Sequence, residues 1–164
     1  TGLLEFVMND ENVSSGEMGE ILVTDLTNYG MPFIRYRIGD AGKPLDEICS
    51  CGRGLPLMKS IEGRVTDFIC TKDRKYISGP GLTLIFSDLN VKMYQVLQEE
   101  VDRFLVRVVM DEGYSDKDER DIVRRMRKII GEESEVIVEQ VESIPRSPRS
   151  GKYRYIISQV ALFR

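Results

Sequence analysis

The stretch RFLVRVVMDEGYSDKDERDIVRRMRKIIGEESEVIVEQ, residues 103–140, decides the fold because its hydrophobic period changes twice. Residues 103–110 carry an apolar side chain at every second position, which predicts a strand with one buried face. Residues 116–130 carry apolar side chains at helical spacing, which predicts an amphipathic helix. Residues 135–141 form a short run rich in valine and isoleucine, which predicts another strand.

Sequence signals mark both ends of the expected helix. Ser115 can cap its N-terminus, and Asp118 can complete a capping box with it. Gly131 is well placed to end the helix, because glycine readily adopts the backbone conformation that follows a helix. The apolar stripe expected to face the core consists of Ile122, Val123, Met126, Ile129 and Ile130.

Short strands and turns dominate the rest of the chain. Before residue 63, strands are predicted at residues 3–8, 20–25 and 32–38. After it, the patterns predict a hairpin, a short helix and two more strands, at residues 65–78, 82–89, 91–98 and 155–160 respectively.

This order of elements predicts an α+β fold, in which a small β-rich subdomain is followed by a small α+β lobe with a mixed or antiparallel sheet. We expect the subdomain over residues 1–62 and the mobile C-terminal lobe over residues 63–164. A hinge is expected near residues 61–64, because few contacts would cross it. The chain begins at Thr1 and not at methionine, which suggests a piece of a longer protein.

The composition excludes several classes of function. The chain of 164 residues has a net charge of −4, which disfavours nucleic acid and anionic membranes as partners. No apolar run approaches the roughly 20 residues that a membrane helix needs, and no signal peptide is evident, so we expect a cytoplasmic protein. The chain contains no histidine, which excludes every histidine-based mechanism within it. Oligomeric state has no signal in the sequence.

One candidate site residue is an aspartate. Asp40 ends the segment PFIRYRIGD, residues 32–40, where it follows glycine at the expected end of a strand. A carboxylate held there could accept two hydrogen bonds from a vicinal diol such as a ribose. Taken alone, Asp40 is better explained as an ordinary turn aspartate, because Gly-Asp is common in turns.

Arginines in the same region could recognise phosphate or carboxylate groups, since the guanidinium fork matches their geometry. Arg35 and Arg37 are expected to share one face of a strand, and Arg64 lies in the segment GRVTDFI, residues 63–69. The alternative is a solvated strand face with ordinary ion pairs.

Lys152 follows a glycine in the basic loop PRSPRSGK, residues 145–152. A flexible lysine there could stabilise the anionic groups of a phosphoryl or acyl-phosphate transition state. A basic surface loop that also contains Arg146, Arg149 and Arg154 is the alternative. A phosphate-binding P-loop is rejected, because its pattern would need glycine at position 146 and serine or threonine at position 153.

The ordered motifs GEILVTDL, MPFIRYRIGD, CSCGRG, GRVTDFI and SGK resemble the C-terminal part of the adenylate-forming superfamily, which contains acyl-CoA synthetases, peptide-synthetase adenylation domains and luciferases. Within it, the chain is most similar to phenylacetate-CoA ligase and its relatives in capsular-polysaccharide biosynthesis. The resemblance implies an enzyme that joins a small carboxylic acid to AMP from ATP and then passes the acyl group to coenzyme A. Mg²⁺ is expected with the ATP.

The resemblance also implies roles for single residues. Asp40 would hold the ribose hydroxyls of ATP or AMP, and Arg64 would contact the nucleotide. Lys152 would bridge the substrate carboxylate and the α-phosphate during adenylation. The lobe that carries this lysine would rotate about Thr66 between the two half-reactions. Thr66 and Ile38 depart from the residues that many relatives have at these positions.

Two segments of the superfamily are absent from this sequence, namely the phosphate-binding loop and the segment that holds adenine and metal. We therefore expect the parent protein to be the enzyme and this chain alone to be inactive. A non-catalytic partner-binding module that keeps the fold is the alternative. A nucleic-acid binder built on the basic loop is disfavoured by the acidic net charge and by the lack of an aromatic stacking array.

The cysteines allow two interpretations. Cys49 and Cys51 form a C-x-C motif, which could supply half of a structural zinc site completed elsewhere in the parent, since zinc needs four ligands. A pair of free thiols is the alternative. Cys70, the remaining cysteine, lies on an expected strand, and an odd count at uneven spacing does not indicate a secreted disulfide framework.

Overall fold

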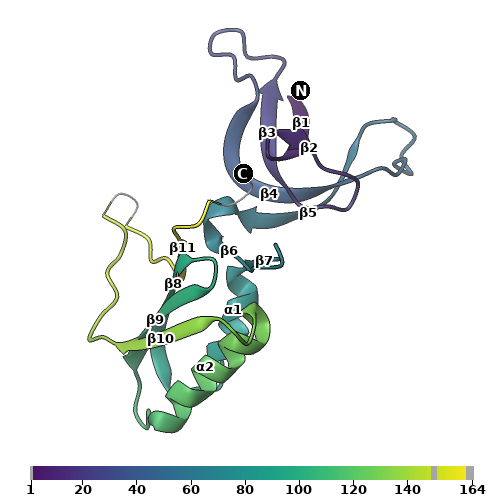
Figure 1. The fold of residues 1–164 in the computed structure, drawn as a ribbon. Coiled ribbons are helices and arrows are strands. Elements are labelled where there is room, and N and C mark those ends of the chain that lie inside the picture. The colour runs from purple at the N-terminus through teal and green to yellow at the C-terminus, as the bar shows by residue number, and fades with distance from the viewer. Residues whose placement is uncertain (1, 149–150, 162–164) are drawn as a thin grey trace. The chain divides into compact units, whose positions relative to one another are not determined.

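The computed structural model describes residues 2–148 and 151–161 (Figure 1). The chain divides between Val65 and Thr66 into two compact units, and each unit is described by itself. Strand β5 (Leu57–Arg64) runs across the sequence-based boundary at residues 62–63, so Gly63 and Arg64 belong to the first unit.

The first unit is a five-stranded antiparallel sheet with strand order β2-β1-β3-β4-β5. The strands preceding β5 are β1 (Gly2–Met8), β2 (Glu11–Asn12), β3 (Gly19–Asp25) and β4 (Tyr36–Leu45). Its small core consists of Phe6, Val7, Ile21, Leu22 and Ala41. Close approach of β4 and β5 requires glycine at one position, because a Cβ on Gly42 would lie 2.8 Å from the carbonyl oxygen of Ser60.

The third expected strand of this unit was placed too early in the chain. Strand β4 begins at Tyr36, and Arg35 before it has a left-handed backbone with φ of 48°. Arg35 and Arg37 therefore do not share one strand face. Asp40 lies inside β4 and not at its end, since Gly39 with φ of 78° bends the strand without ending it.

The two arginines near the start of β4 form ion pairs within the sheet. Arg35 contacts Glu5 with 3.3 Å between Nε and Oε2, and Arg37 contacts both Asp10 and Glu20. These contacts match the alternative interpretation of ordinary ion pairs, because all three partners are carboxylates of the protein itself.

The second unit combines a mixed four-stranded sheet with two α-helices and a short hairpin. The sheet order is β10-β9-β8-β11, in which β8 and β9 are antiparallel and each outer strand is parallel to its neighbour. The expected α+β class with a mixed sheet is confirmed. The turn η1 (Val65–Asp67) crosses the division between the units. The elements after it are β6 (Phe68–Cys70), β7 (Tyr76–Ser78), α1 (Gly79–Phe86), β8 (Val91–Glu100), β9 (Arg103–Met110), α2 (Asp116–Ile130), β10 (Glu135–Gln140) and β11 (Ile156–Ser158).

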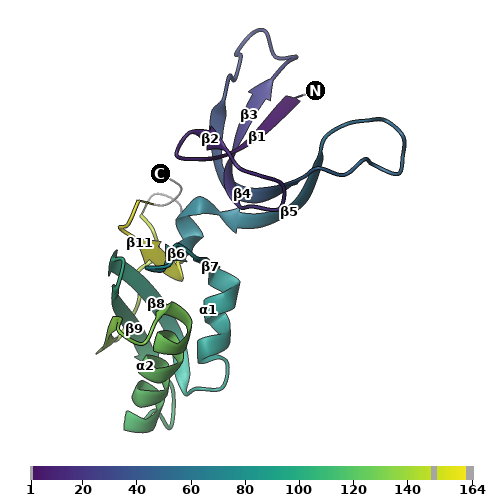
Figure 2. The ribbon, with the colours of Figure 1, turned by 45° about the vertical axis from the view of Figure 1, so that its right-hand side comes forward.

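Both helices pack on the same face of this sheet (Figures 1 and 2). Strand β9 contributes every second residue to the core, as its alternation predicted, although Met110 at its end is 48% exposed. Leucine, isoleucine, phenylalanine and methionine side chains of α1 and α2 pack against these strand residues and form the helical side of the core. The main core residues are Leu82, Ile85, Phe86, Tyr94, Val96, Phe104, Val106, Val108, Ile122, Met126 and Ile130.

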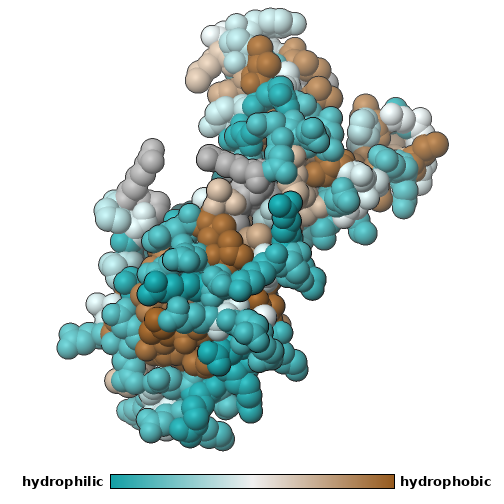
Figure 3. Space-filling model, in the orientation of Figure 1, coloured by the Kyte–Doolittle hydropathy of each residue, from teal (hydrophilic) through white to brown (hydrophobic). Residues whose placement is uncertain are grey.

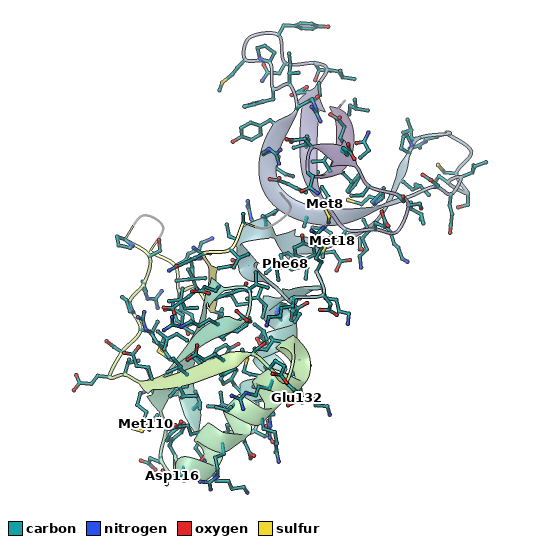
Figure 4. The ribbon with its side chains drawn as sticks, in the orientation of Figure 1. Met8, Met18, Phe68, Met110, Asp116 and Glu132 are labelled. Atoms are coloured by element: carbon teal, nitrogen blue, oxygen red, sulfur yellow. The ribbon has the colours of Figure 1, made fainter. Side chains whose placement is uncertain are left out.

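Helix α2 has the predicted bounds and the predicted ends. The backbone N–H of Ser115 donates to the Asp118 carboxylate over 2.9 Å, which forms the capping box. Gly131 has φ of 114°, and its N–H donates to the Arg127 carbonyl over 2.8 Å. Figure 4 shows Asp116 and Glu132 near the two ends of the helix.

The other face of the sheet is not covered by either helix. On it, Leu105 pairs with Ile137 across β9 and β10, and Ile137 is 41% exposed. Ion pairs flank this apolar pair, with 3.6 Å between Arg103 and Glu135 and 2.9 Å between Arg107 and Glu139. Figure 3 shows the apolar surface over these strands. Within the described part of the chain, no helix is long and apolar enough to cross a membrane.

Candidate functional site

Asp40 and Arg64, which the sequence singles out separately, contact each other. They lie opposite one another in the antiparallel register of β4 and β5, and 3.1 Å separates Arg64 Nε from Asp40 Oδ1. Arg64 also donates from Nη1 to the carbonyl of Ile38 over 3.0 Å. The guanidinium therefore spans the bend at Gly39 and holds the carboxylate in one place.

The pairing of β4 with β5 brings these groups together, and Gly39 beside Asp40 lies where the pairing of β4 with β3 is irregular. The Gly39 φ of 78° lies in the left-handed region that glycine adopts without strain. There is room for a side chain here, because a Cβ on Gly39 would lie 3.7 Å from Arg64 Nη1, an ordinary contact distance. The backbone conformation is therefore what favours glycine at this position. The Asp40 and Arg64 side chains remain 29% and 62% exposed, so a ligand can reach a carboxylate and a guanidinium side by side.

Thr66 lies in the turn η1 at the start of the second unit. Its hydroxyl donates to Asp67 Oδ1 over 3.2 Å, and its carbonyl accepts a hydrogen bond of 2.9 Å from Nη2 of Arg154. Arg154 follows Lys152 by two positions, so the expected pivot is joined directly to the segment that carries the expected catalytic lysine. Sequence reasoning treated Arg154 as part of a basic loop and missed this contact.

The segment around Lys152 is held by its own backbone. The N–H of Ser147 donates to the Lys152 carbonyl, and the N–H of Gly151 donates to the Ser147 carbonyl, both over 2.8 Å. Gly151 has φ of 66°, which suits glycine, and Arg146 donates to its carbonyl over 3.3 Å. Lys152 is exposed at the end of this closed turn. Ser150, which precedes these residues in the SGK motif, lies outside the described residues.

A buried glutamine fixes the elements on either side of this site. Gln98 is fully buried, accepts hydrogen bonds from the Cys70 N–H and the Ser158 hydroxyl, and donates to the Cys70 carbonyl over 2.6 Å. It thereby connects β6, which follows Thr66, with β11, which follows Lys152. No sequence signal marks Gln98, because other polar residues, such as Gln95 and Glu99, occur in the same strand.

Cys49 and Cys51 lie in one turn of the loop between β4 and β5. The Gly52 N–H donates to the Cys49 carbonyl over 3.0 Å, which closes the turn. A hydrogen bond between the two thiols lowers the pKa of Cys51. Residues 2–148 and 151–161 contain no group of three or more histidine, cysteine or acidic side chains able to hold a metal, so the two thiols supply only half of a tetrahedral zinc site.

The site residues thus form two groups. Asp40 and Arg64 meet in the first unit, whereas Thr66, Arg154 and Lys152 belong to the second. A carboxylate beside a guanidinium suits a sugar hydroxyl and a nearby phosphate, and an exposed lysine suits an anion that forms during a reaction.

The family model of the CapK C-terminal domain matches residues 69–159, which is more than half of the chain. The chain belongs to this family. Lys152 and Gln98 lie inside the CapK C-terminal domain, while Asp40, Arg64 and Thr66 precede it. Protein CapK of Staphylococcus aureus is 25% identical over 152 residues, which cover 88% of this chain and 33% of that protein.

Solved structures support the fold expected for this family. A 2-hydroxyisobutyryl-CoA ligase in complex with 2-HIB-AMP is 22% identical, with a TM-score of 0.64 over 96% of this chain and 36% of that one. Fatty acyl-adenylate ligases from E. coli and L. pneumophila give 16% identity and a TM-score of 0.60, over 92% of this chain and 28% of theirs. The fold is that of the C-terminal part of adenylate-forming ligases, which confirms the resemblance.

An anthranilate CoA ligase in complex with anthranoyl-AMP has a similar fold, with 15% identity and a TM-score of 0.57 over 89% of this chain and 30% of that one. The chain spans about a third of the length of the relatives that it matches.

Proposed function

We propose that the chain is the C-terminal portion of an AMP-forming ligase that activates a carboxylic acid with ATP and passes the acyl group to a thiol. The observation that carries the proposal is the contact between Asp40 and Arg64, which presents a carboxylate and a guanidinium together at 3.1 Å. The carboxylate suits the ribose diol of AMP, and the guanidinium suits its phosphate. The first acids to test are phenylacetate and other aryl acids, and coenzyme A is the first acceptor.

The chemistry would need no histidine. A substrate carboxylate oxygen attacks the α-phosphorus of ATP, a new P–O bond forms, and pyrophosphate leaves. In the second step a thiolate attacks the acyl carbon, and AMP leaves with the former carboxylate oxygen. Lys152 would hold the carboxylate and the α-phosphate together, and such placement and charge stabilisation account for most of the rate in reactions of this kind. Mg²⁺ would neutralise phosphate charge when bound.

One site would serve both steps if the second unit moved about Thr66, as the sequence resemblance implies. The contact between Arg154 and Thr66 supports this role, because it would carry a rotation at the pivot directly to the Lys152 segment. Cys49 and Cys51 would supply two of the four ligands of a structural zinc completed by the parent. The free cysteines fit a reducing compartment such as the cytoplasm.

The deciding experiment measures ATP-dependent pyrophosphate release by the full-length parent with a panel of aryl and alkyl acids. Lys152→Ala should reduce the rate by about a hundredfold or more, since it removes the charge that acts in the transition state. Lys128→Ala is the matched control, because Lys128 is an exposed lysine of α2 with no ion pair among the described residues. Release that is equal in wild type and Lys152→Ala, or absent with every acid, would favour a non-catalytic binding module.

A further inference from the structure

A hollow of about 500 Å³ lies within the second unit, and none of Asp40, Arg64, Thr66, Lys152 and Arg154 lines it. It opens between the C-terminal end of α1, the first residues of β8 and the segment that leads into β11. Ligand pockets typically have volumes of about 300–1,000 Å³, so this one could hold a molecule up to the size of a mononucleotide. Its lining residues are Thr83, Phe86, Ser87, Val91, Lys92, Met93, Tyr94, Arg146, Tyr153 and Tyr155.

Aromatic rings form one wall of the hollow. Phe86 and Tyr94 are stacked, with ring centroids 3.8 Å apart, and the Tyr155 ring lies 5.5 Å from that of Tyr94. Tyr153 meets Tyr155 edge-on at 4.5 Å. Tyr155 is 53% exposed, so its ring is accessible to a second planar group. Such a surface favours a flat ring, which would stack or meet these rings edge-on.

Two cationic side chains lie at the hollow without a carboxylate to neutralise them. The lining contains Lys92 and Arg146 and no aspartate or glutamate. Arg146 donates to the Gly151 carbonyl, and neither cation forms an ion pair with an acidic residue in the described part of the chain. In a protein with net charge −4, an aromatic hollow that carries only positive charge selects for an anion.

The wall also contains a buried hydroxyl group. The hydroxyl oxygen of Tyr153 is buried, and the backbone of Tyr94 lies close enough to it to lower its pKa through a hydrogen bond. Burial raises the pKa of Tyr153 to about 12, so its hydroxyl stays protonated and can donate.

We propose that this hollow binds a small molecule that combines a planar aromatic ring with an anionic group. The ring lies against Tyr94 and Tyr155, and the anion lies between Lys92 and Arg146. A nucleoside phosphate and an aromatic carboxylate share this chemistry, and the experiment distinguishes them. The inference is independent of the proposed ligase activity, because no residue assigned to that activity lines the hollow.

The test uses the 164-residue chain, labelled with ¹⁵N, and follows amide chemical shifts during titration. The probes are AMP and benzoate as ring-bearing anions, and inorganic phosphate and adenosine as the separate halves. At least one ring-bearing anion should shift the amides of Thr83, Lys92 and Tyr155 in a saturable manner. If AMP is that anion, it should bind about tenfold more tightly than adenosine or inorganic phosphate, because ring contacts and charge act together.

Variants locate the binding. Lys92→Gln and Tyr155→Leu should each weaken it about fivefold or more, by removing the charge or the ring. Lys128→Gln is the control for charge and should leave the affinity unchanged, while unperturbed spectra confirm that each variant is folded. AMP binding alone identifies a nucleotide site, and benzoate binding alone identifies an aromatic acid site. Shifts confined to the surroundings of Asp40, no saturable shift with either anion, or binding unchanged in both variants would overturn the proposal.

Discussion

The guanidinium of Arg154 donates a hydrogen bond of 2.9 Å to the backbone carbonyl of Thr66, 88 positions earlier in the chain. The contact joins the first turn of the second unit to the segment that enters β11. Since Gln95 donates to the Arg154 carbonyl over 2.9 Å, the same residue is held from both its backbone and its side chain. Arg154 therefore holds together the turn that contains Thr66 and the segment that contains Lys152, and the proposed function uses both.

Replacing Arg154 by alanine should loosen the turn η1. The variant loses a charge-assisted hydrogen bond from a half-buried residue, which should lower the free energy of unfolding by about 1–2 kcal/mol. Urea unfolding measures the loss, and limited proteolysis should detect faster cleavage at residues 65–67. Arg124→Ala is the control, because Arg124 forms an ion pair with Asp121 on the surface of α2. Equal proteolysis of wild type and Arg154→Ala would show that the contact does not hold the turn.

Replacing Gln98 by leucine should destabilise the second unit more strongly. Leucine fits the volume but leaves the N–H and carbonyl of Cys70 without their side-chain partner. Unsatisfied buried polar groups cost about 1–3 kcal/mol each, so a loss of roughly 2–6 kcal/mol is expected in urea unfolding. The exposed Gln140→Leu serves as the comparison. If Gln98→Leu lowered the free energy of unfolding by less than Gln140→Leu does, Gln98 would not be holding β6 and β11 together.

Asp118 should make stability depend on acid pH. Hydrogen bonding to Ser115, and further bonds to Asn90, lower the pKa of the Asp118 carboxyl. The unfolded chain therefore binds the proton more readily than the folded one, and stability falls as pH drops below the ordinary aspartate pKa of about 4. Asp118→Asn removes this titration.

The difference in urea midpoint between wild type and Asp118→Asn measures this effect of Asp118. It should be largest at pH 6 and shrink as the pH approaches 3. A difference that stays constant over this range would show that the capping interaction does not depend on the charge of Asp118.

The three cysteines should react at different rates with a maleimide. The hydrogen bond from Cys49 lowers the pKa of Cys51, so more of the Cys51 thiol is reactive thiolate at neutral pH. Burial raises the pKa of Cys70, which should react last. Mass spectrometry after brief labelling gives the order, and Cys49→Ser should change the rate at Cys51 but not at Cys70. Labelling of Cys70 first would contradict this assignment of reactivity.

Local patterns in the sequence were sufficient wherever neighbouring residues decide the structure. The alternation of residues 103–110 and the capping signals of α2 predicted both elements at their observed bounds, because strand and helix periods and caps depend on residues a few positions apart. The hairpin β6–β7 around the turn at residues 72–74 was likewise predicted.

Strand β5 and the position of Asp40 could not be predicted in this way. Residues 57–64 lack apolar alternation, and pairing with β4 is what holds them as a strand. The sequence marked Asp40, Arg64, Thr66 and Lys152 as residues suited to a nucleotide and an anion, through their chemistry and order. The tertiary structure alone decided that Asp40 meets Arg64, that Arg154 reaches Thr66, and that Lys92 and Tyr155 line one hollow. These contacts depend on strand register and on chain segments that lie far apart in the sequence, and no local pattern encodes either of them.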